Sequence, residues 1–235
     1  MSYASALRCL PLVSPEEVFG DDGLVVVAPH PDDETLGCGG LLAWASHHGL
    51  LRHIAFLTDG GKSHPDGLQD LPGIRRAEAV AAAAQVGCGP GQLSFRGLPD
   101  AGLAALNDEE RRQTVQWLRS LISGMGTCKC LVTAQTDPHG DHRAAYGLVC
   151  EAIEGLPDVT LMTYPIWSWL IEDTPAALDG VRVRVGDYRP AKSAAIQAYA
   201  SQLGRHPLDV EGFVLPEELL NHVDTDIEVF LRPEL

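Results

Sequence analysis

The sequence predicts an α/β fold in which a Rossmann-like, largely parallel sheet is flanked by helices, with a small strand and helix extension at the C-terminal end. Two observations support this prediction. Short apolar runs alternate with helical segments along most of the chain, which is typical of β-α-β units around a parallel sheet. The run Leu24–Ala28 (LVVVA) is continuously apolar and rich in β-branched residues, as expected for a strand that is buried on both faces.

The expected elements follow this first strand in a regular order. A helix over 36–48 has three glycines near its start, which suits tight packing against the sheet and does not match the Gly-x-Gly-x-x-Gly spacing of a dinucleotide-binding loop. Further strands are expected at 54–58, 93–95, 131–134 and 160–164. Further helices are expected at 73–86, 108–123 and 143–153. The helix 73–86 ends before Gly87, a residue type that often follows a helix.

The C-terminal part of the chain has a different pattern but no linker before it. Residues 181–185 alternate between valine and arginine, which predicts a half-exposed strand. A helix over 191–202 and a closing strand over 227–231 are expected to follow. We therefore expect one domain over residues 1–235, with a core at about 24–165 and a C-terminal extension at about 166–235.

The charge balance argues against two classes of partner. The chain has 17 Lys and Arg against 32 Asp and Glu, a formal net charge of −15. Nucleic acids and anionic membranes are bound mainly through clustered basic residues, so we expect neither as a partner. No apolar run is long enough to span a membrane, and the N-terminal segment lacks the cationic start of a signal peptide. The six cysteines are scattered, which favours free thiols and a cytoplasmic location.

Two loops contain the residue types of a catalytic metal site. The first, Pro29–Glu34 (PHPDDE), follows the strand 24–28, and the second, Asp137–Arg143 (DPHGDHR), follows the strand 131–134. Ligands of open parallel sheets bind at the carboxyl ends of the strands. If these two strands are neighbours in the sheet, the loops face each other and bring three imidazoles and at least three carboxylates together.

Such a set has enough groups for a hydrolytic metal centre. Two histidines and one carboxylate commonly hold a catalytic zinc and leave one position for water, whose pKa the metal lowers to about 7. A further carboxylate can accept the proton of that water, and a further imidazole can stabilise an oxyanion or protonate a leaving group. Alternatively, Asp32, Asp33 and Glu34 could only cap the following helix, with His139 and His142 as ordinary loop residues. The presence of both loops at strand ends favours the metal site.

The two motifs resemble those of the LmbE/PIG-L family of zinc-dependent N-acetylglucosaminyl de-N-acetylases. The resemblance rests on His-Pro-Asp-Asp-Glu at 30–34 together with His-Gly-Asp-His at 139–142, and it covers about 24–202. Shorter matches support it, namely Thr58-Asp59-Gly60, Arg75-Arg-Ala-Glu78, Pro99-Asp100 and Lys192…Ser201-Gln202. This chain has Pro29 where many members have alanine before the histidine, a departure that should leave the ligands intact.

The resemblance implies a metal site and a general base. His30, Asp33 and His142 would bind the metal, which would be Zn²⁺, with Fe²⁺ as an alternative in vivo. Asp32 would be the general base that deprotonates the metal-bound water. The residues alone do not distinguish Asp32 from Asp33, so this assignment comes from the resemblance.

The resemblance also implies roles for residues around the metal. His139 would stabilise the oxyanion or act as an acid, and Asp141 would orient an imidazole. Arg75 and Asp100 match positions that contact the sugar or its substituent. Trp167 follows a strand end and is a further candidate for substrate contact, although the sequence favours packing in the core or at an interface for this residue.

The implied activity is removal of the N-acetyl group from a small-molecule N-acetylglucosamine-type conjugate, with metal-bound water as the nucleophile and a free amine and acetate as products. One alternative is a non-catalytic relative that only binds sugar conjugates, although such a protein needs no additional general base. The other is an Fe(II) oxygenase with His30, Asp32 and His142 as its triad, which the α/β pattern disfavours. We expect specificity to lie in 62–73 and 165–190, and relatives that form trimers and hexamers leave a homo-oligomer open.

Overall fold

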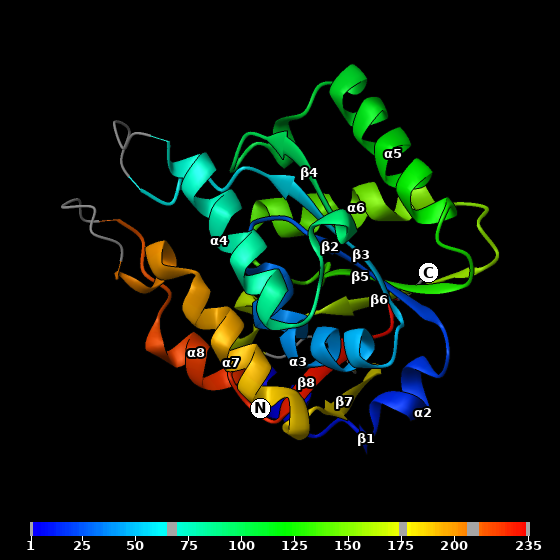
Figure 1. Cartoon of the computed structure of the whole chain (residues 1–235), viewed down its shortest axis with the longest axis vertical. Helices are drawn as coiled ribbons and strands as arrows, with labels where there is room; N and C mark the ends of the chain where they lie inside the picture. Colours follow the sequence, from blue (N-terminus) through cyan, green and yellow to red (C-terminus); the bar gives the residue numbers. More distant parts are fainter. Residues whose placement is uncertain (1, 65–69, 174–177, 206–211, 234–235) are drawn as a thin grey trace.

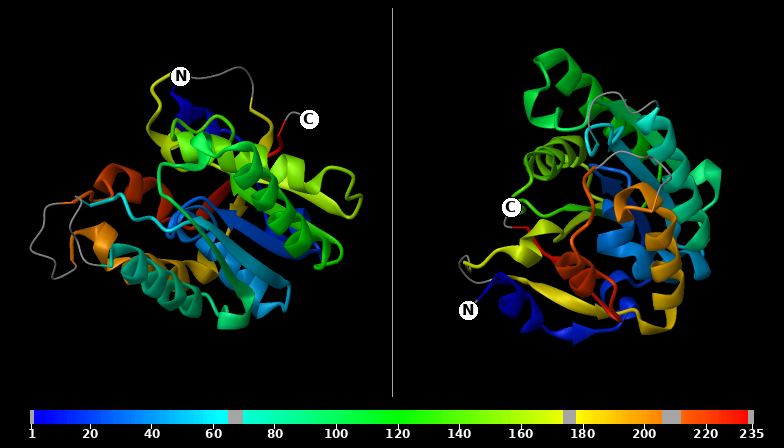
Figure 2. Two further views of the ribbon diagram at one scale, coloured as in Figure 1. Left: turned by 90° about the horizontal axis from the view of Figure 1, so that it is seen from above. Right: turned by 90° about the vertical axis from the view of Figure 1, so that its left-hand side faces the viewer.

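The computed structural model describes residues 2–64, 70–173, 178–205 and 212–233. One eight-stranded sheet lies at the centre, with helices on both faces (Figures 1 and 2). The strands are β1 (Leu12–Val13), β2 (Gly23–Ala28), β3 (Leu51–Thr58), β4 (Leu93–Leu98), β5 (Cys128–Thr133), β6 (Val159–Tyr164), β7 (Gly180–Arg184) and β8 (Ile227–Leu231). The helices are α1 (Tyr3–Arg8), α2 (Pro15–Phe19), α3 (Asp33–His47), α4 (Leu71–Gln85), α5 (Asp108–Ser123), α6 (Gly140–Ile153), α7 (Arg189–Ala198) and α8 (Glu217–Val223).

The predicted largely parallel sheet is confirmed. The strand order is β1-β7-β8-β6-β5-β2-β3-β4, and the pairs from β6 to β4 are all parallel. Only β8 runs antiparallel to its neighbours, β6 and β7, so the C-terminal part extends the same sheet. The first and fourth predicted strands, β2 and β5, are neighbours, and their carboxyl ends therefore lie side by side.

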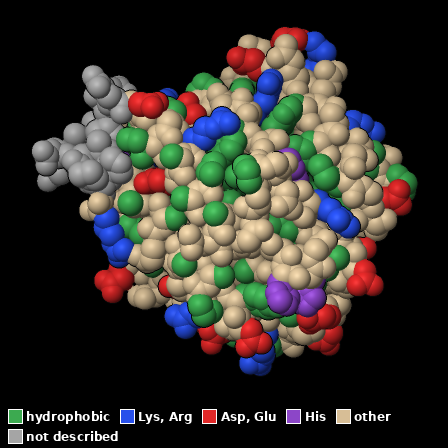
Figure 3. All heavy atoms as spheres, in the orientation of Figure 1, with side chains coloured by type: hydrophobic (Ala, Val, Ile, Leu, Met, Phe, Trp, Pro, Cys, Tyr) green, Lys and Arg blue, Asp and Glu red, His purple; other side chains and the backbone are tan. Residues whose placement is uncertain are grey.

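Helices cover the sheet in two layers. In Figure 2, α3, α4 and α7 lie against one face of the sheet, and α5 and α6 lie against the other. Each layer packs over its own apolar cluster, and every residue of β2, which separates the two clusters, is buried. On the face shown in Figure 3, basic side chains are scattered among acidic ones and form no continuous patch.

The glycines of α3 allow the close packing that the sequence predicted. A Cβ atom on Gly37 would overlap the ring of Tyr164, and one on Gly40 would lie 2.5 Å from Val185. The hydroxyl of Tyr164 in turn donates to the carbonyl oxygen of Val27 in β2. These contacts hold the first turn of α3 close to the carboxyl end of β2.

Several boundaries differ from the sequence predictions. α3 begins at Asp33 instead of 36, and α6 begins at Gly140 instead of 143, so residues of both motif loops form the first helical turns. The helix expected over 191–202 ends at Ala198 and is followed by a separate 3₁₀ turn. The short elements α1, β1, α2 and α8 were not predicted, because segments of two to seven residues carry too little periodicity to identify.

Within the described segments, no helix has the length and apolar character needed to cross a membrane. The six cysteines are all free thiols. A cytoplasmic location and a homo-oligomeric state stay predictions.

Candidate metal centre and catalytic pocket

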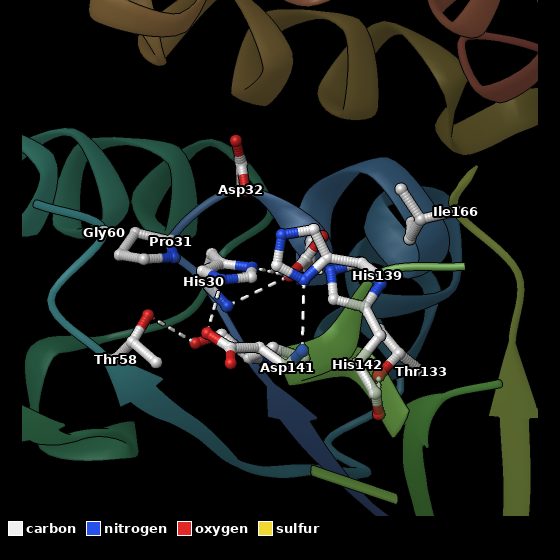
Figure 4. A network of polar contacts seen from close by, with 12 residues as sticks. His30, Pro31, Asp32, Thr58, Gly60, Thr133, His139, Asp141, His142 and Ile166 are labelled. Atoms are coloured by element: carbon white, nitrogen blue, oxygen red, sulfur yellow. Dashed lines mark hydrogen bonds and ion pairs between the residues drawn. The ribbon is translucent and has the colours of Figure 1, made fainter. Parts of the chain in front are cut away.

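Three imidazoles lie together where the two motif loops meet (Figure 4). Ring nitrogens of His30, His139 and His142 lie within 4.8 Å of one another. His30 comes from the loop after β2, whereas His139 and His142 come from the N-terminal cap and first turn of α6. His142 is fully buried and His30 nearly so, while His139 is half-buried at the edge of the group. The two loops therefore face each other, as expected because β2 and β5 are neighbours in the sheet.

Asp33 places one carboxylate oxygen between two of these rings. Its Oδ2 lies 3.1 Å from Nδ1 of His30 and 3.2 Å from Nε2 of His142. The same oxygen accepts the backbone N–H of His30 at 3.0 Å. Burial alone would raise the pKa of Asp33, but the charges and hydrogen bonds of His142 and His30 outweigh it and hold this pKa far below its usual range. An ionised carboxylate is thus stabilised between two imidazole nitrogens.

The remote nitrogen of each of these two rings faces another carboxylate. Nε2 of His30 lies 3.1 Å from Oδ1 of Asp100 and 3.2 Å from Oδ2 of Asp141. Nδ1 of His142 lies 3.2 Å from Oδ1 of Asp137. Histidines that bind metals usually have such a partner on the remote nitrogen, which fixes the tautomer and the ring orientation.

The donor set fits a divalent cation. The contacts of His142 with Asp33 and Asp137 are poorly aligned, and neither of its buried ring nitrogens has a proper hydrogen-bond partner. Burial would lower the pKa of His142, but the carboxylates of Asp33 and Asp137 raise it to about 9. Two imidazole nitrogens and one carboxylate oxygen suit Zn²⁺ or Fe²⁺.

A second group of possible ligands surrounds the other side of His30. One carboxylate oxygen of Asp100, one carboxylate oxygen of Asp141 and one ring nitrogen of His30 all lie within 4.8 Å of one another. The remaining oxygen of each carboxylate is engaged by the backbone: Asp100 accepts the N–H of Lys62, and Asp141 accepts the N–H of Leu103, both at 3.0 Å. These fixed carboxylates are well placed to orient His30.

Asp32 lies apart from the ligand group and is held in an unusual conformation. In Figure 4 its side chain lies on the opposite side of His30 from Asp141. Its φ of 141° is a strained value for a residue with a side chain. Glu34 accepts the backbone N–H of Asp32 at 3.1 Å, and the hydroxyl of Tyr199 in turn donates to Glu34 at 2.5 Å. This network, which Tyr199 joins from the end of α7, stabilises the strained backbone.

The environment of the Asp32 carboxylate brings its pKa close to neutrality. Its Oδ2 lies 2.9 Å from Nη2 of Arg75, and only 6% of the residue is exposed. Burial raises the pKa of Asp32 to about 7, even though Arg75 lowers it, and the neighbouring charges of Asp33 and Glu34 act in the same direction as burial. A group with a pKa near neutrality is suited to general base catalysis.

His139 has the hydrogen bonding of a neutral donor. Its Nδ1 accepts the backbone N–H of Asp141 at 3.2 Å. Burial, together with the nearby His142 and His30, lowers the pKa of His139. The neutral ring therefore carries its proton on Nε2, which is left to donate to a ligand.

The two motif loops open into a cavity of about 270 Å³. Its lining includes His30, Asp32, Asp33 and His139, together with all three residues predicted to contact substrate. Two of those three also have partners within the protein: Arg75 donates to the carbonyl oxygens of Gly60 and Pro31 besides pairing with Asp32, and Asp100 contacts His30. Nε of Arg75 is buried without a partner. Trp167 is half-buried in the cavity wall.

Several residues around the site were not predicted from the sequence. Asp137 lies in the second motif loop, two residues before His139, and this position could have identified it as a site residue. Tyr199, Phe213 and Leu215 come from the C-terminal part, where no motif identified them. Gln202, which also lines the cavity, belongs to the short match Ser201-Gln202, but that match gave it no role. Of the two segments expected to set specificity, residues 65–69 and 174–177 lie outside the described residues, while Lys62, Ser63, Ile166 and Trp167 line the cavity.

Comparisons with known proteins agree with the fold. The model of the PIG-L family, described as GlcNAc-PI de-N-acetylase, matches residues 25–153. The 1D-myo-inositol 2-acetamido-2-deoxy-alpha-D-glucopyranoside deacetylase of Mycolicibacterium smegmatis is 27% identical over 186 residues, which cover 70% of this chain. The match spans 64% of that relative's length.

Solved structures share the same architecture. The conserved protein TT1542 from Thermus thermophilus has a TM-score of 0.64 and 28% identity, covering 91% of this chain and 95% of that protein. The N,N'-diacetylchitobiose deacetylase from Pyrococcus horikoshii has a TM-score of 0.58 and 20% identity, covering 93% of this chain and 79% of that protein. At 20% identity, the similarity to the Pyrococcus horikoshii structure shows a common fold.

Proposed function

This chain belongs to the PIG-L family of GlcNAc-PI de-N-acetylases, and from that membership we propose that it is a zinc-dependent hydrolase. It removes the N-acetyl group from an N-acetylglucosamine-type conjugate and releases acetate and a free amine. The main support is that Asp33 lies between His30 and His142 in the cavity that also contains Asp32 and His139. The named deacetylase from Mycolicibacterium smegmatis supports the same reaction class.

Three side chains would hold the metal ion. His30 would bind through Nδ1, Asp33 through Oδ2 and His142 through Nε2, because these atoms converge while the remote ring nitrogens face other carboxylates. A divalent cation bound there would polarise the acetamido carbonyl and lower the pKa of a water molecule. The same ligands also suit Fe²⁺, which is the alternative metal in vivo.

Asp32 would accept the proton of the attacking water. Its carboxylate lines the cavity next to the ligands without being one of them, and Arg75 fixes its orientation at 2.9 Å. The strained backbone, held by Glu34, keeps Asp32 from turning away from the cavity. When the C–N bond breaks, the proton held by Asp32 can pass to the departing amine.

His139 would stabilise the negative charge that develops on the carbonyl oxygen. Its Nδ1 is already occupied by the N–H of Asp141, so Nε2–H is the group left to donate. A donor fixed in place before the reaction gives more stabilisation than one that must reorient. Asp141 contributes twice, since its side chain also orients His30 at 3.2 Å.

The cavity suits a small amino sugar. Its volume of about 270 Å³ lies near the lower end of small-molecule sites, about 300–1,000 Å³. Arg75 and Asp100 lie beside the catalytic groups and would contact the sugar or its acetamido substituent, with Trp167 along the wall. A sugar of this kind is the small-molecule partner that we propose.

Two alternatives fit the geometry less well. A protein that only binds sugar conjugates gains nothing from burying Asp32 in a strained conformation beside a ligand group. An Fe(II) oxygenase triad would use Asp32, but Asp33 is the carboxylate that lies between His30 and His142. Both observations favour hydrolysis.

Assays of both products test this proposal. Purified protein, stripped with a chelator and reloaded with Zn²⁺ or Fe²⁺, is incubated with a panel of N-acetylglucosaminides, and free amine and acetate are measured. Equal amounts of both products, formed only by the reloaded protein, are expected. Absence of amine from the whole panel, despite one bound metal per chain, would favour the binding-only alternative.

A further inference from the structure

The mouth of the cavity has an unusual exposed apolar segment. In the described part of the chain, the large hydrophobic side chains exposed to solvent are Leu12, Val80, Phe213 and Val214. Phe213, 39% exposed, lines the catalytic cavity, and Val214, 48% exposed, follows it. Of this exposed set, Phe213 is the member that lines the cavity. Ligand cavities are commonly lined by aromatic and other apolar side chains.

Phe213 faces a second aromatic ring across the mouth. The ring centroids of Phe213 and Trp167 lie 5.9 Å apart, with an interplanar angle of 68°. Such an edge-to-face pair presents a ring face and a ring edge to whatever enters beside it. Ile166, Leu36 and Leu215 continue the apolar surface into the cavity.

Hydrogen bonds fix the backbone at both aromatic residues. The N–H of Phe213 donates to the carbonyl oxygen of Ser63 at 2.7 Å, and the N–H of Trp167 donates to Oδ2 of Asp137 at 2.8 Å. The N–H of Leu215 donates to the carbonyl oxygen of Gln202 at 2.8 Å. A preorganised apolar surface loses little conformational entropy when a ligand binds to it.

The size of the cavity determines what reaches this surface. A cavity of about 270 Å³ has room for a sugar ring, and the part of a conjugate that extends from this ring can lie against Trp167 and Phe213 in the cavity wall. Nη2 of Arg75 is paired with Asp32, which offsets the positive charge of the guanidinium. Lys62 is the remaining basic residue of the lining. The part of the lining formed by Ile166, Trp167, Phe213 and Leu215 is apolar.

We propose that Trp167 and Phe213 form an aglycone subsite, and that the substrate is an N-acetylglucosamine-type glycoside with an apolar, preferably aromatic, aglycone. This inference rests on the proposed deacetylase function. The aglycone lies against the two rings while the acetamido group points to the metal centre. An aglycone carrying negative charge, recognised by Lys62, is the competing possibility.

Kinetic comparison of matched glycosides tests the subsite. The probes are the phenyl, methyl and carboxymethyl glycosides of N-acetylglucosamine, each with the Zn²⁺-loaded full chain. We expect kcat/KM for the phenyl glycoside to exceed that for the methyl glycoside about tenfold or more. Phe213→Ala and Trp167→Leu should each bring this ratio close to one. Val80→Ala removes an exposed apolar side chain on α4 that does not line the cavity, and it should keep the wild-type ratio.

A binding experiment separates failure of the subsite from failure of the deacetylase function. Calorimetric titration of wild type, Phe213→Ala and Trp167→Leu with phenyl and methyl glucosaminide, the free-amine forms, requires no turnover. The subsite is supported if wild type binds the phenyl compound more tightly than the methyl compound and both substitutions weaken this preference. This conclusion holds even if no glycoside is hydrolysed. Equal binding and equal kcat/KM for phenyl and methyl compounds would overturn the subsite while leaving deacetylation intact. Preference for the carboxymethyl glycoside, lost in Lys62→Ala, would also overturn it.

Discussion

Asp137 and His142 are joined by a buried contact of 3.2 Å between Oδ1 of the carboxylate and Nδ1 of the ring. The other oxygen of Asp137 accepts the backbone N–H groups of Ile166 at 3.2 Å and Trp167 at 2.8 Å. One fully buried carboxylate therefore orients a proposed metal ligand and fixes the cavity wall. Asp137 therefore connects the proposed metal site to the wall of the cavity.

Asp137→Asn should weaken metal binding. An amide can still accept the backbone N–H groups, but it lacks the charge that stabilises the orientation of His142, and loss of such a partner typically costs 10–100-fold in metal affinity. Competition with a chromogenic chelator measures this affinity. Asp179→Asn changes an exposed carboxylate paired with Arg232 and serves as the matched control. Unchanged affinity in Asp137→Asn would contradict the proposed link.

Substitution of Asp32 and substitution of the adjacent Asp33 should affect activity and metal content differently. Asp32→Asn removes the proposed base and should lower kcat by about 10²–10⁴-fold while keeping the bound metal. Asp33→Asn removes the carboxylate between His30 and His142 and should lose the metal. Metal content by mass spectrometry, measured alongside amine release, separates the two effects. The assignment fails if Asp32→Asn loses the metal or Asp33→Asn keeps it.

The buried pair of Lys192 and Glu228 should be important for stability. Nζ of Lys192 lies 2.8 Å from Oε1 of Glu228, and Glu228 also accepts the backbone N–H groups of Gly40 and Leu41 in α3. Lys192→Met leaves a buried carboxylate unpaired and should cost about 3–5 kcal/mol. The free energy of unfolding in urea measures this cost.

A matched pair of controls accompanies that measurement. The double variant Lys192→Met/Glu228→Gln removes the charge left behind and should be more stable than the single variant. Arg232→Met breaks an exposed pair with Asp179 and should cost less than about 1 kcal/mol. Equal losses of unfolding free energy in Lys192→Met and Arg232→Met would show that the buried pair contributes no more to stability than the exposed pair.

His53 should make stability depend on pH. Burial lowers the pKa of His53, whose Nε2 lies 2.8 Å from the hydroxyl of Ser94. Because the folded pKa is depressed below the unfolded value of 6.5, its contribution to stability is fully present above pH 6.5 and is lost as the pH falls through the folded pKa. The difference in unfolding free energy between pH 7.5 and 5 should therefore be smaller in His53→Asn than in wild type. An equal difference in both proteins would refute this role.

The sequence predicted those elements that have strong local signals. The bounds of α5 were predicted to the residue, because Asn107 and Glu110 form a capping box and buried residues recur at helical spacing. β2 was evident from its continuous apolar run. α8 and the N-terminal elements escaped detection, since their stability depends on packing against distant segments and leaves little local pattern.

The meeting of the two motif loops was more predictable than the contacts around them. The motif loops placed His30 and His142 at strand ends, and the adjacency of β2 and β5 brought them together. By contrast, Tyr199 reaches Glu34 from the end of α7, and Phe213 reaches Trp167 from the C-terminal part. Such contacts depend on how the chain returns to the sheet, which no local pattern encodes.

The central claim is that His30, Asp33 and His142 hold one catalytic metal ion. Anomalous diffraction from crystals of the Zn²⁺-loaded protein, recorded on both sides of the zinc absorption edge, locates such an ion directly. We expect one peak at about 2.0–2.2 Å from Nδ1 of His30, Oδ2 of Asp33 and Nε2 of His142. A peak bound by His30, Asp100 and Asp141 instead, or no peak within the cavity, would contradict it.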